Sequence, residues 1–231
     1  MHKSVIGLAA ILLSSTAAPA FADAITLDSG AIGQNYTFGY NGFSDGTAIN
    51  GLTALATFTL TGITPTSYTF DYSLTNTTSA PLTSRVSSFA FNTNPDIASA
   101  TSTGAYSYTT LSSNYPNGIG TVDVCFKDAS TGSCAGGGGG GVTTGQTGTG
   151  SFALNFSAPI TSLTLSDFFV RYQSITGAGN VSSASGSGTL TSTSSGGTPV
   201  PEPGMLGLLG GGVLAVAFRR RLRAGPKLGL A

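Results

Sequence analysis

The stretch Tyr68-Thr69-Phe70-Asp71-Tyr72-Ser73-Leu74-Thr75 decides the fold class of this chain. Apolar and polar side chains alternate through the whole stretch. Neighbouring side chains of an extended strand point to opposite faces, so the pattern predicts a strand with one buried and one exposed face. A helix would repeat its apolar residues with a period of 3.6 instead. The stretch therefore predicts β structure.

The same period of two recurs along the chain. It is found at residues 57–61, at 86–91 with one slip, and at 151–156. Phe, Tyr, Ile, Val and Thr fill these runs, and these residues have high β-propensity. Shorter runs of the same composition predict further strands at 24–27, 35–40, 105–109, 120–126, 163–172 and 188–191.

Residues with turn-forming chemistry separate the expected strands. Many short strands with turns between them, and no capped segment of helical period, indicate an all-β fold. We expect an antiparallel β-sandwich, jelly-roll-like, followed by a single C-terminal transmembrane helix. The expected turns lie at 41–42, 45–46, 50–51, 76–81, 94–96, 117–118 and 177–180.

Composition limits the function classes. The chain has 231 residues, of which 8% are charged, 34 are glycine and 63 are serine or threonine. Residues 23–198 contain three basic against eight acidic side chains, so the body is acidic. Binding to nucleic acid needs clustered Lys and Arg to neutralise phosphates, so no nucleic-acid partner is expected.

The N-terminus has the order of regions that is typical of a secretory signal peptide. Lys3 precedes an apolar run at 5–13, and Ala20-Phe21-Ala22 follows. Ala20 and Ala22 are the small residues that a signal peptidase needs, so residues 1–22 are expected to be removed. The alternative, a retained anchor, would need a longer apolar run to span the bilayer.

The C-terminus is organised as a second processing segment. Residues 192–203 form a Ser/Gly/Pro linker after the body at 23–191, and the linker ends in Pro201-Glu202-Pro203. The apolar run that follows spans about 21 Å as a helix, against about 30 Å of hydrocarbon. We predict a marginal transmembrane helix with a basic cluster at 204–223 and a cytoplasmic tail at 224–231. By the positive-inside rule, four arginines act as the stop-transfer signal: Arg219, Arg220, Arg221 and Arg223.

A Pro-Glu-Pro element, an apolar helix and an arginine cluster in this order resemble the PEP-CTERM sorting signal of Gram-negative bacteria. The resemblance implies that an exosortase-type membrane protease recognises Pro201-Glu202-Pro203, removes the tail and delivers the body to the cell surface. Residence in the inner membrane would then be transient. A plain single-pass tail anchor is the alternative.

The body resembles the so-called cistern family of PEP-CTERM proteins. The resemblance is carried by Asn114-Tyr115-Pro116-Asn117-Gly118, by Val122-Asp123-Val124-Cys125-Phe126-Lys127, and by Ser133-Cys134 before six glycines. The family implies no activity for this chain.

Cys125 and Cys134 are expected to form one disulfide, since the protein enters an oxidising compartment. A redox motif would have the spacing C-x-x-C, and a zinc site would need more ligands. The glycines at 136–141 are followed by no Lys-Ser or Lys-Thr, so they are interpreted as a flexible loop and not as a phosphate-binding loop.

An enzyme is not expected, and no catalytic residue, metal or cofactor is assigned. The one histidine, His2, leaves with the signal peptide, and no glutamate precedes Glu202. Without a histidine, the mature body can contain neither a Ser-His-Asp nor a Cys-His nucleophile, and no histidine-ligated zinc site. Paired aspartates for glycoside hydrolysis stay open as an alternative, with Asp71, Asp123 and Asp167 as candidates. The competing interpretation is that these aspartates face solvent on their strands.

The expected function is an exported component of the cell surface or of an exopolysaccharide or biofilm matrix, with exopolysaccharide as a further partner. The alternative is a carbohydrate- or calcium-binding module. Calcium would bind the oxygen-rich segment 41–45. Sugar rings would stack on exposed tyrosines, although the chain has no tryptophan. The candidate tyrosines are Tyr36, Tyr40, Tyr106, Tyr108, Tyr115 and Tyr172.

Overall fold

The computed structural model describes residues 23–130, 134–135 and 139–195. Its described part consists of β-strands and two single-turn 3-10 helices, η1 (Ser29–Ala31) and η2 (Gly104–Tyr106). The predicted all-β class is confirmed. The strands are β1 (Ile25–Leu27), β2 (Gln34–Ser44), β3 (Thr47–Thr64), β4 (Ser67–Asn76), β5 (Thr83–Asn94), β6 (Ser99–Ser102), β7 (Tyr108–Tyr115), β8 (Gly120–Lys127), β9 (Val142–Thr143), β10 (Thr147–Asn155), β11 (Leu163–Thr176) and β12 (Ser183–Ser195).

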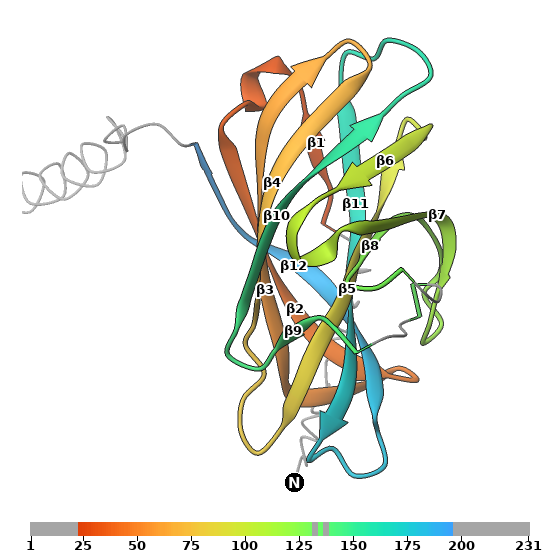
Figure 1. Ribbon diagram of the computed structural model, residues 1–231. Coiled ribbons are helices and arrows are strands. Elements are labelled where there is room, and N and C mark those ends of the chain that lie inside the picture. The colour runs from red at the N-terminus through yellow and green to blue at the C-terminus, as the bar shows by residue number, and fades with distance from the viewer. Residues whose placement is uncertain (1–22, 131–133, 136–138, 196–231) are drawn as a thin grey trace, which may run out of the picture. The chain divides into compact units, whose positions relative to one another are not determined.

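The strands form one antiparallel sheet in the order β6-β10-β4-β3-β2-β12-β11-β5-β8-β7, with β1 added to β11 and β9 to β5. The sheet folds over, so that the half containing β4 and β10 faces the half containing β5 and β8 (Figure 1). Its two ends meet where Thr109 Oγ1 of β7 donates to the Ala100 carbonyl of β6 at 3.2 Å. The sheet is therefore nearly closed, whereas the expected sandwich had two separate sheets.

Consecutive strands β2, β3 and β4 lie side by side because their connections are very short. Asp45 and Gly46, with φ values of 49° and 76°, join β2 to β3 in the left-handed conformation that a tight two-residue hairpin needs. Pro65 and Thr66 join β3 to β4. A two-residue turn cannot cross between sheets, so the strand order differs from the jelly-roll-like order that we expected.

The core lies between the two facing halves of the sheet and is rich in aromatic rings. Tyr68, Phe70, Tyr72 and Leu74 of β4 are all at most 3% exposed, as their alternation predicts. Phe152 of β10 is the centre of the ring cluster, since its ring centroid lies 4.7–6.4 Å from six others. The six partner rings are Phe58, Phe70, Tyr72, Phe89, Phe91 and Phe126.

Two expected turns are wrong, because Asn41-Gly42 and Asn50-Gly51 lie inside β2 and β3. Glycine at these positions allows the hydrogen-bonded pairing of β2 with β3 to be irregular. A Cβ on Gly42 would lie 2.5 Å from Leu52 Cδ2, and Gly51 has a φ of 85°. The register between β2 and β3 shifts at this place.

The expected strand at 105–109 is wrong in its first half, where η2 stands instead. The side chain of Tyr106 turns into the core there. Its hydroxyl donates to the Val86 carbonyl at 3.0 Å, and its N–H donates to the Tyr72 hydroxyl at 2.9 Å. These bonds stabilise a turn where the sequence pattern favours a strand.

Candidate functional site

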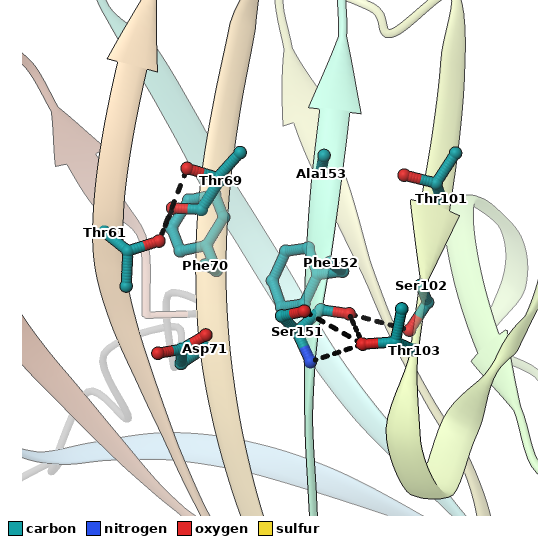
Figure 2. Close-up of a pocket in the computed structure, with 10 residues that line it drawn as sticks. All are labelled: Thr61, Thr69, Phe70, Asp71, Thr101, Ser102, Thr103, Ser151, Phe152 and Ala153. Carbon is teal, nitrogen blue, oxygen red and sulfur yellow. Dashed lines mark hydrogen bonds between the residues drawn. The ribbon is translucent and has the colours of Figure 1, made fainter.

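A groove of about 270 Å³ crosses the outer face of β3, β4, β10 and β6 (Figure 2). The antiparallel registers bring hydroxyl-bearing residues from four strands to this face, because each strand alternates core and surface positions. Asp71 stands opposite Thr59 on one side and Ser151 on the other. The residues that line the groove are Thr61, Thr69, Phe70, Asp71, Thr101, Ser102, Thr103, Ser151, Phe152 and Ala153.

Hydrogen bonds hold the hydroxyls of the groove in place. Thr103 Oγ1 and Ser151 Oγ are 2.9 Å apart. Ser102 Oγ donates to the Ser151 carbonyl at 3.2 Å, and Thr61 Oγ1 donates to the Thr69 carbonyl at 3.1 Å. These bonds link neighbouring segments of the chain, so they hold the hydroxyls of Thr61, Ser102, Thr103 and Ser151 in place.

Asp71 differs from its neighbours in the groove. Its side chain is exposed, and no described residue forms a hydrogen bond or an ion pair with its carboxylate. Figure 2 shows the carboxylate on the groove side of β4, between Thr61 and Ser151. Asp71 is therefore an acceptor that is available to a ligand.

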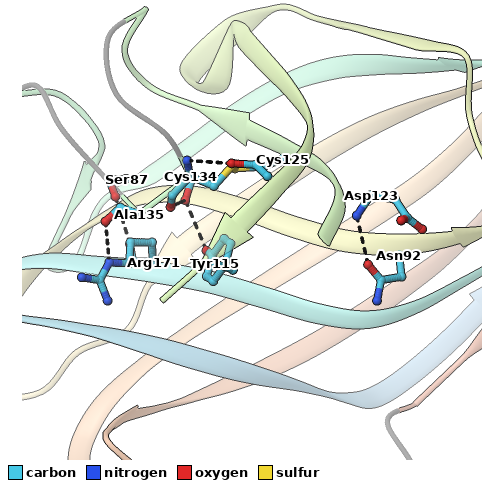
Figure 3. The surroundings of a disulfide bond; sticks show 10 residues. Ser87, Asn92, Tyr115, Asp123, Cys125, Cys134, Ala135 and Arg171 are labelled. Atoms are coloured by element: carbon cyan, nitrogen blue, oxygen red, sulfur yellow. Dashed lines mark hydrogen bonds between the residues drawn. A yellow bond between two sulfur atoms is a disulfide. The ribbon is translucent and has the colours of Figure 1, made fainter. Parts of the chain in front are cut away.

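The other two candidate aspartates lie in a different place and hold strands together. Asp123 of β8 accepts from the Thr93 N–H at 2.7 Å, and its own N–H donates to Asn92 Oδ1 at 3.0 Å (Figure 3). Asn92 Nδ2 in turn donates to Asp167 Oδ2 at 3.0 Å. The structure thus brings Asp123 and Asp167 to one asparagine of β5, and it does not bring Asp71 to them.

The predicted disulfide is confirmed. Cys125 of β8 is bonded to Cys134, with 6.2 Å between the Cα atoms, and both residues are fully buried (Figure 3). The bond belongs to a second small apolar cluster with Ala90, Tyr115 and Val122. The N–H of Cys134 donates to Ser113 Oγ at 3.4 Å. The disulfide therefore anchors the segment after β8 against β7 and β5.

Arg171 of β11 provides an anchor that the sequence did not indicate. It is 7% exposed, and its Nε donates to the Ala135 carbonyl at 2.8 Å. Nη2 donates to Ser183 Oγ at 2.8 Å. With the Asn117 amide turned so that its oxygen faces the donors around it, that oxygen accepts from Nη1 at 3.1 Å. Burial lowers the pKa of the Arg171 guanidinium, and the nearby Tyr115 opposes this shift. One buried cation thus joins the residue after Cys134 to the β7–β8 turn and to β12.

Arg85 of β5 holds the far end of the glycine-rich segment. Its Nη1 donates to the Gly140 carbonyl and lies 3.3 Å from Asp128 Oδ2 in an ion pair. Burial raises the pKa of the Asp128 carboxyl, and Arg85 partly offsets the rise. A Cβ on Gly141, whose φ is 99°, would lie 2.4 Å from the Val86 carbonyl oxygen. The described ends of the expected flexible loop are therefore tightly attached to the sheet.

Five of the six tyrosines proposed for sugar stacking are buried, so that prediction is wrong for them. Tyr108 alone among the six is exposed, at 45%. Alternation alone does not decide which face of a strand is buried. The nearly closed sheet encloses the face that carries these five tyrosines. Burial raises the pKa of the other five: Tyr36, Tyr40, Tyr106, Tyr115 and Tyr172.

The calcium interpretation of residues 41–45 does not fit the structure. Residues 41–44 belong to β2, and Asp45 forms the tight turn after it. Among the described residues, no group of three or more His, Cys, Asp or Glu side chains is placed to hold a metal ion.

The processing residues at both ends of the chain lie outside the described residues. They are Ala20, Ala22, Pro201, Glu202, Pro203, Arg219, Arg220, Arg221 and Arg223. The predicted transmembrane segment at 204–223 also lies there, and in the described part no helix is long and apolar enough to cross a bilayer. Asp23, the first described residue, accepts from the Leu190 N–H of β12.

Residues 199–221 match the family model of the PEP-CTERM protein-sorting motif. The match includes Pro201-Glu202-Pro203, the apolar run and the first three arginines. Neither the curated proteins nor the solved structures contain a match to this chain. The motif supports an exported protein that an exosortase recognises and processes at the membrane.

Proposed function

We propose that the mature body of this PEP-CTERM protein is a non-enzymatic component of the cell surface or of an exopolysaccharide matrix. The observation that carries the proposal is the sorting motif at 199–221, because it implies delivery by an exosortase. Cleavage takes place at or near Pro201-Glu202-Pro203. Proline disfavours helical structure in the residue before it, which suits a peptide that a protease must reach, and the arginines act as the stop-transfer signal until the tail is cut.

The arrangement of the charged groups supports a structural role. Asp123 and Asp167 accept hydrogen bonds that link neighbouring strands. Arg85 and Arg171 bind carbonyl groups of the segment that follows the disulfide. These side chains stabilise the fold and are therefore poorly suited to proton transfer.

The resemblance to the cistern family is part of the same proposal. Its three segments meet around the disulfide, since Tyr115 and Val122 pack in one cluster with Cys125 and Cys134. Asn117 reaches Arg171 beside them. Shared packing of this kind gives a physical reason for the three segments to occur together.

The sorting step is tested by intact mass spectrometry of the mature protein. Wild type is expected to lack residues 205–231, whereas Glu202→Ala is expected to keep them and to remain in the inner membrane fraction. Ser194→Ala, in the linker but outside the matched motif, is the control and should be processed normally. Wild-type protein that retains residues 205–231, both with the sorting protease and in a strain lacking it, would show a plain tail anchor.

The absence of catalysis is tested on the purified body. Incubation with glycans should release no new reducing ends. Hydrolysis that is lost in Asp71→Asn, or in Asp123→Asn, would overturn the non-enzymatic assignment.

A further inference from the structure

We propose that the groove across β3, β4, β10 and β6 binds one chain of a neutral polysaccharide. The inference rests on the proposed function, which places the body beside such polymers, and it names the surface that holds them. The site is separate from the tyrosines considered above, because none of them lines the groove.

The chemistry of the lining matches that of a sugar chain. Thr61, Thr69, Thr101, Thr103 and Ser151 present hydroxyl groups to the groove. The O–H groups of Thr61 and Thr69 already donate within the protein, so their oxygens offer acceptor sites to the hydroxyls of a sugar. Hydrogen bonds already restrict the rotamers of Thr61, Thr69, Thr103 and Ser151, so little entropy of these side chains is lost when a ligand binds. The groove is therefore preorganised for a ligand with many hydroxyls.

Asp71 provides the strongest acceptor in the groove. Hydrogen bonds to an ionised carboxylate are about twice as strong as those between neutral groups. The carboxylate is exposed and has no partner among the described residues, so a sugar hydroxyl can donate to it without displacing a protein group.

Charge selects the class of polymer. Asp71 is the one ionisable residue in the lining, and no lysine or arginine lines the groove. An anionic polysaccharide would bring negative groups to this carboxylate and to an acidic body, with no cation to compensate them. A neutral chain meets no such repulsion.

The extent of the groove suits an oligomeric segment. It crosses four strands, and three gaps of about 4.8 Å between neighbouring strands give about 14 Å. A polysaccharide chain that lies across the strands would pass from Thr61 over Asp71 and Ser151 to Thr103, which directly follows β6. β3, β4, β10 and the residue after β6 then each contribute at least one polar contact.

Affinity electrophoresis of the purified body tests the inference. The gels contain dextran, galactomannan or hydroxyethylcellulose as neutral polymers, or alginate as an anionic polymer. We expect at least one neutral polymer, and not alginate, to retard the wild-type protein. Asp71→Ala should weaken that retardation about tenfold. Thr75→Val is the matched control, because Thr75 lies on the same face of β4 but outside the lining.

Circular dichroism of each variant shows whether it is folded, and Asp71→Ala is expected to be native because the residue is exposed. Equal retardation of Asp71→Ala and wild type would overturn the site, and so would retardation by alginate alone. Wild-type protein that none of the three neutral polymers retards would overturn the ligand class. The proposed function fails separately, since its test measures the C-terminal mass and the cell fraction.

Discussion

Removal of the Cys125–Cys134 disulfide is expected to lower the free energy of unfolding by about 2–3 kcal/mol. The perturbation is the double replacement Cys125→Ala and Cys134→Ala. The two cysteines are nine positions apart. For a loop of this size, the chain-entropy relation gives about 2.6 kcal/mol, because the bond restricts the unfolded chain.

The folded structure adds to this entropic effect. Without the bond, the segment at 134–135 is still held by the Ser113 hydroxyl and by Arg171. The double variant also removes two sulfur atoms that are fully buried in the cluster with Ala90, Tyr115 and Val122. The measured loss of the double variant should therefore be at or slightly above the entropic value.

Equilibrium unfolding in urea provides the assay, with oxidised wild type, reduced wild type and the double variant compared under the same conditions. Both the reduced protein and the variant should unfold at lower urea concentration, with little change in the dependence on denaturant. The reasoning would be refuted if the double variant lost less than about 1 kcal/mol, since the relation predicts more than twice that.

Two further predictions concern buried groups. Arg171→Met should lower the free energy of unfolding by about 2–3 kcal/mol, because the Ala135 carbonyl, Ser183 and Asn117 lose a charged donor. Unfolding in urea measures this loss. A change within about 0.5 kcal/mol, as for an ordinary surface substitution, would show that Arg171 is no anchor. Stability should also fall as the pH rises above about 10, by up to about 1.4 kcal/mol per pH unit for each buried tyrosine, because the unfolded chain releases a proton that the folded chain retains. Burial raises the folded-state pKa of Tyr40, Tyr106, Tyr115 and Tyr172, so tyrosinate absorbance and loss of the circular dichroism signal should rise together, with a smaller slope in Tyr115→Phe. Tyrosinate that forms for all tyrosines while the spectrum stays native would contradict this.

The sequence predicted most strands because side-chain alternation is a local property. Residues 68–75 alternate polar and apolar groups, and β4 buries the apolar ones, as expected. The Asp45-Gly46 turn was also predictable, since both residues adopt left-handed φ values readily. Asn41-Gly42 has similar chemistry but lies inside a strand. Its role depends on the close approach of Leu52, which the local sequence does not show.

The sorting motif and the disulfide could be assigned from the sequence, because both depend on residues that are close along the chain. The groove could not. It joins Thr61, Asp71, Thr101 and Ser151, which lie up to 90 positions apart. The one available signal was the set of Ser and Thr residues that alternate with apolar residues in each predicted strand. That signal predicts an exposed face on each strand, but it does not predict which strands lie next to one another.

The sequence by itself determined that the body is β-rich, acidic, exported and stabilised by a disulfide, because period, charge and motif are read along the chain. Only the tertiary structure decided which faces are enclosed. Closure of the sheet buried Tyr40, Tyr106, Tyr115 and Tyr172 and left Asp71 exposed in a groove. The physical reason is that alternation is a local property, which separates the two faces of one strand. Which face is enclosed in the core depends on how strands that are distant in the sequence pair and curve around one another.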